Sequence, residues 1–136
     1  KTSEETAPDV NTKTQLTSLK GKYKFTSETE NNYHNATINI LEQNDSTIKF
    51  EISAVNGKDI DHVNIGELEG TAKKVGINQY VYEETIDGTT HKITFVFDAH
   101  RIFEWVTISE SYYPDNNNPF AGHGVYFTGD YEKINN

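Results

Sequence analysis

The feature that most constrains this chain is an alternation of apolar and polar residues that starts at Leu19 and continues almost to the C-terminus. Successive side chains of a β-strand point to opposite faces, so each alternating run predicts a strand with one buried face. Eight such runs follow one another, and none keeps a helical period. They cover residues 22–25, 36–41, 48–54, 65–73, 79–86, 92–98, 102–109 and 124–133. The sequence therefore predicts an all-β protein.

Short polar turns separate these runs and indicate the topology. Asp87-Gly88 is the strongest hairpin signal, because both positions of a tight two-residue turn need a positive φ. Short connections favour a meander of neighbouring antiparallel strands. Because the open edges of a sheet invite aggregation, we expect the strands to close into an eight-stranded antiparallel up-and-down β-barrel. A two-sheet β-sandwich is the alternative.

Large aromatic side chains should supply much of the barrel interior. In the run 102–109 this expectation places Phe103, Trp105 and Thr107 on the inner face. Gly66 and Gly70 should allow the sharp bending that a small barrel requires. The expected interior aromatic residues are Phe25, Phe50, Tyr80, Tyr82, Phe95, Phe97, Phe103, Trp105 and Phe127.

An eight-stranded barrel is either filled by its own side chains or holds one small ligand. In the second case a small apolar or aromatic molecule would lie in the barrel mouth. The residues expected to bind it are Tyr80, Tyr82, Phe95 and Trp105.

The N-terminal residues 1–18 differ from the rest of the chain, being polar and rich in threonine. Such a segment buries too little apolar surface to offset the entropy lost on ordering. We therefore predict a flexible leader over residues 1–18 and a β-barrel domain over residues 19–136. The chain begins with Lys1 and contains no methionine, which indicates a removed signal segment and a periplasmic, envelope or secreted location. A cleaved tag is the alternative explanation of this start. A lipid anchor on the leader is an open alternative.

Composition and charge exclude several classes of protein. Without cysteine, the chain has no disulfide framework and no thiol nucleophile. Its net charge is −9, from 12 basic and 21 acidic residues, and no basic cluster is present to neutralise phosphates. Nucleic-acid binding is therefore not expected, whereas an acidic surface favours cationic partners. No apolar run reaches the roughly 18 residues that a membrane-spanning helix needs.

Two segments carry a resemblance to known families. Gly21-Lys22-Tyr23 resembles the Gly-x-Trp opening of calycin barrels (lipocalins and fatty-acid-binding proteins), with tyrosine in place of tryptophan. The ending from Phe120 to Lys133 is similar to a Gly-x-Gly-Val-x-Phe-x-Gly-x-Tyr pattern of uncharacterised small bacterial envelope proteins. Periplasmic lysozyme inhibitors share the size and the eight-stranded design. These resemblances imply a bacterial envelope β-barrel.

No constellation of residues predicts catalysis. Ser109 and Ser111 flank Glu110, but no Gly-x-Ser-x-Gly elbow surrounds either serine. Glu83 and Glu84 are adjacent on one strand and point to opposite faces, so they cannot act as a glycosidase pair. The histidines lack the spacing of a metal site. We expect a non-enzymatic protein with no metal and no cofactor.

The segment 109–123 is the longest irregular stretch of the domain, and long loops in compact domains are often functional. Its aromatic residues suit a protein interface. A cationic secreted protein such as a lysozyme is therefore the alternative to the small apolar ligand. The residues expected to contact such a partner are Tyr112, Tyr113, Phe120 and His123.

Overall fold

The computed structural model describes residues 16, 18–30, 32–100, 103–111, 117–120, 122–123 and 125–134. This part of the chain contains β-strands and no helix, so the all-β prediction is confirmed. The strands are β1 (Gly21–Thr29), β2 (Asn32–Gln43), β3 (Thr47–Asp59), β4 (His62–Gly76), β5 (Gln79–Ile86), β6 (Thr89–His100), β7 (Phe103–Glu110), β8 (Asn117–Asn118), β9 (Gly122–His123) and β10 (Gly129–Lys133).

Eight of these strands close into one antiparallel ring, in the order β1-β10-β7-β6-β5-β4-β3-β2. The remaining strands, β8 and β9, pair with each other between β7 and β10 in the sequence. Apart from this small insertion and the closing pair of β1 with β10, neighbours in the ring are neighbours in the chain. The predicted eight-stranded up-and-down β-barrel is therefore confirmed.

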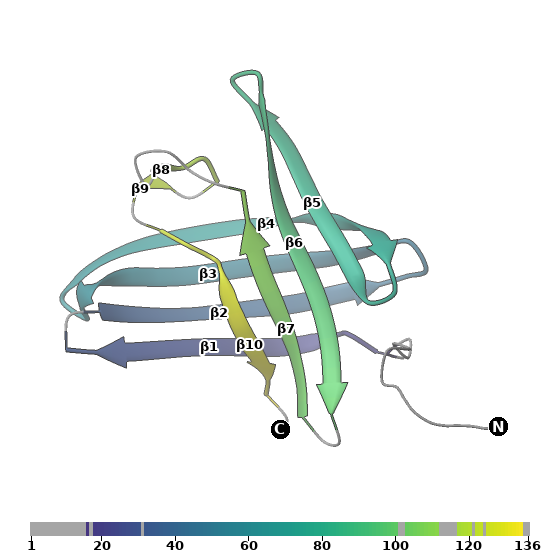
Figure 1. Ribbon diagram of the computed structural model, residues 1–136, viewed down its shortest axis with the longest axis horizontal. Coiled ribbons are helices and arrows are strands. Elements are labelled where there is room, and N and C mark those ends of the chain that lie inside the picture. Colours follow the sequence, from purple (N-terminus) through teal and green to yellow (C-terminus); the bar gives the residue numbers. More distant parts are fainter. Residues whose placement is uncertain are drawn as a thin grey trace.

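The barrel is flattened into two layers whose strands cross steeply (Figure 1). One layer holds the long strands β1 to β4, and the other holds β5, β6, β7 and β10. Two short seams join the layers: β1 pairs with β10 at two register positions, and β4 pairs with β5 at three. In contrast, β4 pairs with β3 from Lys73 back to His62. Most of β4 therefore has only one partner strand among the described residues.

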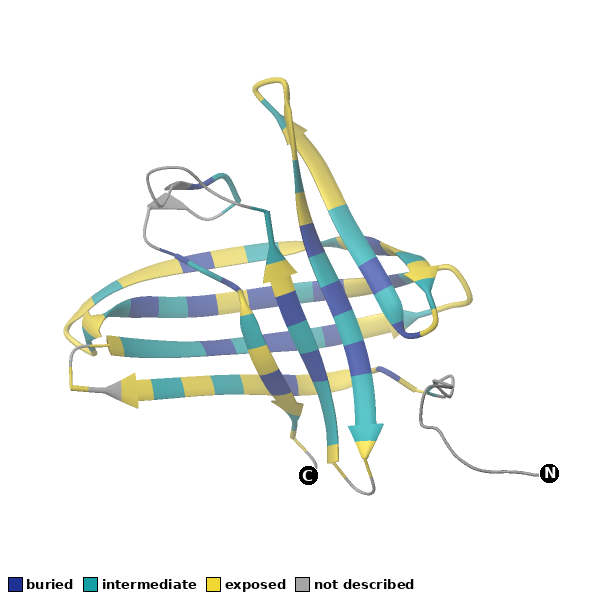
Figure 2. Cartoon of the chain, viewed as in Figure 1, coloured by how far each residue is buried: buried dark blue, intermediate teal, exposed yellow. Residues whose placement is uncertain are grey.

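Buried and exposed residues alternate along the strands, as an inner and an outer barrel face require (Figure 2). In β6 the buried residues are Ile93, Phe95 and Phe97, as predicted. In β3 they include Ile48 and Phe50. The alternation in these strands gave the correct inner face.

The predicted inner face of β7 is wrong. The buried residues of this strand are Val106 and Ile108, whereas Phe103 is 53% exposed and Trp105 is half-buried. In the register of the sheet, Val106 lies between Phe97 of β6 and Tyr131 of β10, both fully buried. Two large rings at this level leave room for a small branched side chain only, so Trp105 lies on the outer face.

Aromatic rings fill the centre of the barrel. Phe50 and Phe95 have ring centroids 4.8 Å apart, and Phe95 stacks on Phe97 at 6.4 Å. Phe97 also meets Tyr23 and Tyr80 edge-on, at 5.7 and 5.9 Å. Ring pairs at these separations contribute about 0.5–1.5 kcal/mol each beyond the area they bury. The two layers are therefore held together by a continuous aromatic core.

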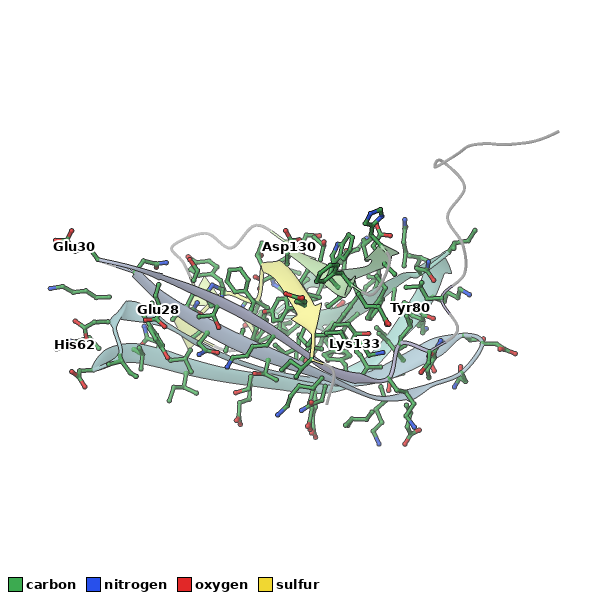
Figure 3. All side chains as sticks on the ribbon, turned by 90° about the horizontal axis from the view of Figure 1, so that it is seen from below. Glu28, Glu30, His62, Tyr80, Asp130 and Lys133 are labelled. Atoms are coloured by element: carbon green, nitrogen blue, oxygen red, sulfur yellow. The ribbon has the colours of Figure 1, made fainter. Side chains whose placement is uncertain are left out.

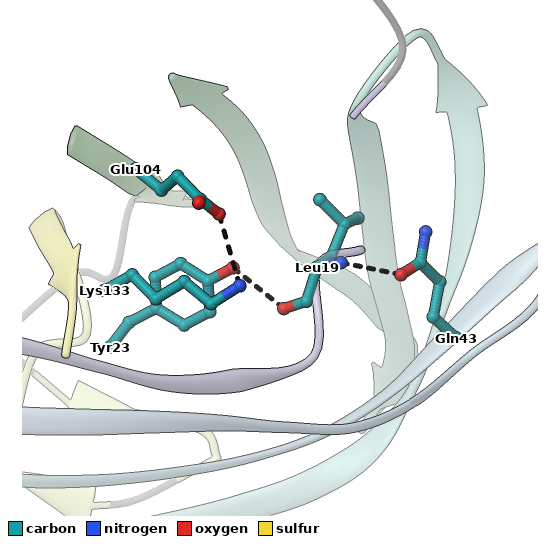
Figure 4. Close-up of polar contacts among 5 residues, drawn as sticks. All are labelled: Leu19, Tyr23, Gln43, Glu104 and Lys133. Carbon is teal, nitrogen blue, oxygen red and sulfur yellow. Dashed lines mark hydrogen bonds and ion pairs between the residues drawn. The ribbon is translucent and has the colours of Figure 1, made fainter. Parts of the chain in front are cut away.

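The segment before β1 joins this core through Leu19 and is held by polar contacts (Figure 4). Leu19 is buried, and its N–H donates to Gln43 Oε1 at 2.7 Å. The Tyr23 hydroxyl donates to the carbonyl oxygen of Leu19 at 2.8 Å. Beside Tyr23, Lys133 Nζ lies 3.2 Å from Glu104 Oε1. The predicted leader lies almost entirely outside the described residues, but its Leu16 packs against the core.

Candidate functional site

The structure places two of the four predicted ligand-binding residues inside the packed core. Tyr80 is 1% exposed and Phe95 is 0% exposed. Both rings contact other aromatic rings of the core rather than an open mouth. Figure 3 shows Tyr80 among the densely packed side chains between the two layers. A ligand at this position would have to displace the core itself.

Tyr82 lies at the seam where β4 and β5 part. Its ring packs on Gly70, where an added Cβ would lie 2.6 Å from Tyr82 Cε1, and it meets Phe50 edge-on at 5.4 Å. Gly70 therefore makes room for this ring. The Tyr82 hydroxyl donates to Glu84 Oε1 at 2.6 Å. Burial is the main reason that the pKa of Tyr82 rises to about 12, and the Glu84 carboxylate adds to the rise.

Trp105, the fourth predicted ligand residue, lies on the outer face of β7 and outside the barrel interior. Its register neighbours are Asp98 on β6 and Glu132 on β10. The structure therefore separates Trp105 from Tyr80, Tyr82 and Phe95. The four residues do not form one site.

The segment 109–123 is described in part. Tyr112 and Tyr113 lie outside the described residues, and of His123 only the backbone pairing in β9 is described. Phe120 is half-buried and packs edge-on against Tyr82 and His91, with centroid distances of 5.7 and 6.1 Å. Phe120 thus covers the interior beside the seam.

Glu110 fastens the segment that follows β7, a role that the sequence analysis missed. Its Oε2 atom accepts hydrogen bonds from the backbone N–H groups of Phe127 and Thr128, at 2.6 and 2.8 Å, and from the Thr128 hydroxyl at 2.7 Å. Its Oε1 atom accepts one from Asn118 Nδ2 at 3.2 Å. No sequence motif marks a carboxylate whose donors lie eight or more residues further along the chain.

An acidic surface lies on the outer face beside the seam. Glu67 and Glu69 of β4 are exposed, and Glu69 lies opposite Glu51 of β3 in the register. These three carboxylates, together with Thr37, Asn39 and Ser53, line a shallow hollow of about 320 Å³ that we call the acidic hollow. In the alternating run 65–73, Glu67 and Glu69 fall on one face, but nothing in this run indicates that β4 and β5 would part here.

Elsewhere in the barrel, burial shifts the pKa values of two buried tyrosines and of His34. Burial raises the pKa of Tyr131 and of Tyr23, with the carboxylates of Glu110 and Glu104 adding to the respective shifts. Burial lowers the pKa of His34, whose ring meets Phe25 at 4.7 Å. Within the described ranges, no group of three or more His, Asp or Glu side chains could hold a metal ion.

Comparisons with protein-family models, with curated proteins and with solved structures gave no match for this chain. The described residues also include no helix long and apolar enough to cross a membrane. The structure classifies the protein by its fold, which is an eight-stranded up-and-down β-barrel.

Proposed function

We propose that this protein is a non-enzymatic binding protein of the bacterial envelope or the secreted space, and that it takes a cationic protein or peptide on its outer surface. The observation that carries the proposal is the filled interior, in which Tyr80 and Phe95 are at most 1% exposed. Recognition then falls to the outer surface, and the chain has a net charge of −9. Acidic surfaces attract cationic partners and steer their approach.

The small apolar ligand remains a second candidate, because one observation favours it. The half-buried rings of Tyr82 and Phe120 meet where β4 and β5 part. An apolar molecule that displaced these rings would reach Phe50. This candidate requires side-chain movement, whereas the cationic partner requires none.

Lysozyme is a suitable cationic probe for the proposed function. We expect the immobilised protein to retain lysozyme at an ionic strength of about 0.01 M and to release it at about 1 M, because the screening length falls from about 30 Å to about 3 Å. Lysozyme with acetylated lysines is the matched control, since it keeps the fold and loses much of the positive charge. Equal capture of both forms, or capture of neither, would contradict the proposal.

A further inference from the structure

One edge of β4 lacks a partner strand over most of its length, as far as the described residues go. β4 pairs with β3 along residues 62–73, but with β5 only at Lys73, Lys74 and Gly76. From His62 to Ala72, the side of β4 that faces away from β3 is therefore unpaired within the described part of the chain.

The direction of the free backbone groups follows from one hydrogen bond. The Lys74 N–H donates to the carbonyl of Ser46, just before β3, at 2.8 Å. Successive residues of a strand direct their N–H and C=O groups to opposite sides, so even-numbered residues of β4 bond toward β3. The odd-numbered residues direct theirs to the unpaired side. We call this row the β4 edge: Val63, Ile65, Glu67, Glu69 and Thr71.

Four of the five residues of the β4 edge are exposed, and the stretch carries little of the usual protection of an edge strand. Ile65 is 65% exposed, and Glu67, Glu69 and Thr71 are exposed as well. Natural edge strands are commonly blocked by proline, by charged side chains (lysine above all) or by a covering segment. The stretch 63–71 contains neither proline nor lysine, and its only charges are the two glutamates.

These charges select the kind of strand that can pair here. In an added strand, alternate side chains would lie on the outer face beside Glu67 and Glu69, where opposite charges are favoured and like charges are disfavoured. The acidic hollow, with Glu51, extends the same charge across β3. On the inner face, Leu68 of β4 and Tyr82 of β5 are half-buried apolar side chains that pack against the core. The edge therefore suits a strand that alternates basic and apolar residues.

A second copy of this chain is a poor occupant. Two antiparallel β4 edges paired around Leu68 would set Glu67 of one copy against Glu69 of the other. Each copy would also bring its net charge of −9. Like charges directly opposite each other destabilise strand pairs.

We propose that the β4 edge is a strand-addition site, where an extended segment with alternating basic and apolar residues pairs with the backbone of residues 63–71. The basic character of the segment rests on the proposed function. The pairing itself rests on the open edge. In strand addition, main-chain hydrogen bonds supply affinity and alternate side chains supply specificity.

Amide hydrogen exchange followed by NMR tests the pairing, with a short peptide of alternating lysine and valine as the probe. In the free protein, the amides of the β4 edge should exchange rapidly, while those of Gly66, Leu68 and Gly70 are protected by β3. The peptide should slow exchange at the edge amides by about tenfold or more and leave the even-numbered ones unchanged. Protection that grows with protein concentration without peptide would instead identify a second copy and overturn the proposal.

Two methylated analogues separate strand addition from simple charge attraction. Each carries N-methyl groups on alternate amides, one set at lysine and the other at valine, so the charge is the same. Only one set faces the β4 edge, so one analogue should lose about tenfold or more in affinity and the other should bind like the parent. If both bind like the parent, the edge proposal is wrong while lysozyme capture still supports the proposed function. If neither lysozyme nor the peptide binds, both proposals fail.

A pair of charge-neutralising variants locates the site. Glu67→Gln with Glu69→Gln should weaken peptide binding by about 2- to 30-fold, the range expected for two exposed ion pairs. Asp130→Asn with Glu132→Gln is the matched control, because both residues are exposed on β10 in the other layer. An equal effect of the two double variants would overturn the assignment to the β4 edge.

Discussion

Phe50→Ala should lower the free energy of unfolding by about 3–5 kcal/mol, the usual cost of truncating a buried phenylalanine. Phe50 is 0% exposed and packs against Phe95 and Tyr82, at centroid distances of 4.8 and 5.4 Å. The substitution removes a ring from the centre of the barrel and leaves a cavity. Urea unfolding of the wild-type protein and the variant measures the loss.

Phe103→Ala is the matched control, because it removes the same ring from the outer face. Phe103 is 53% exposed, so its loss should change stability by no more than about 0.5 kcal/mol. Similar losses for the two variants would contradict the inner and outer faces described above. A loss below about 1 kcal/mol for Phe50→Ala would indicate a loosely packed interior with room for a ligand.

Glu110→Ala should cost about 1–3 kcal/mol, the penalty for leaving a buried backbone donor without a partner. Glu110 accepts the N–H of Phe127, which is itself 0% exposed, at 2.6 Å. The two Thr128 donors are exposed and can turn to water, so they add less. Denaturant unfolding gives the global cost, and hydrogen exchange at the Phe127 amide shows whether this segment opens locally.

Glu110→Gln supplies the control for this prediction. The amide oxygen can still accept the Phe127 N–H, but without the charge that strengthens such a bond. We expect a smaller loss than for the alanine variant. If Glu110→Ala unfolds like the wild-type protein and the Phe127 amide stays equally protected, Glu110 does not fasten this segment.

The strands and the ring could be predicted because they depend on local patterns. The alternation over residues 79–86 coincides with β5. The Asp87-Gly88 turn has the predicted positive φ at both positions, 52° and 81°. Once most strands are joined by short turns, a meander is the simplest topology, and closure of the edges completes the barrel.

The inner face of β7 could not be predicted because both of its faces are apolar. Phe103 and Trp105 favour one face, and Val106 and Ile108 favour the other. The choice depends on Phe97 and Tyr131, which lie on either side of Val106 only after the strands pair. A local pattern carries no information on the size of neighbours in space.

The open β4 edge and the acidic hollow beside it could not be predicted for a similar reason. The run 65–73 indicated a strand with Glu67 and Glu69 on one face, and this assignment agrees with their exposure. β5 pairs with β4 at only three register positions because the two layers cross, and this crossing arises only when the strands assemble. The glycines at 66 and 70 were the only local sign of an unusual strand, and at Gly70 the reason is the Tyr82 ring.

Native mass spectrometry of the protein purified from its own host tests most directly the central claim that the barrel is filled and that recognition takes place outside it. We predict the mass of the bare chain, both in the native state and after denaturation. An additional mass of small-molecule size that is present in the native protein and lost on denaturation would contradict the claim. Such a molecule would favour the second candidate, an apolar ligand behind Tyr82 and Phe120.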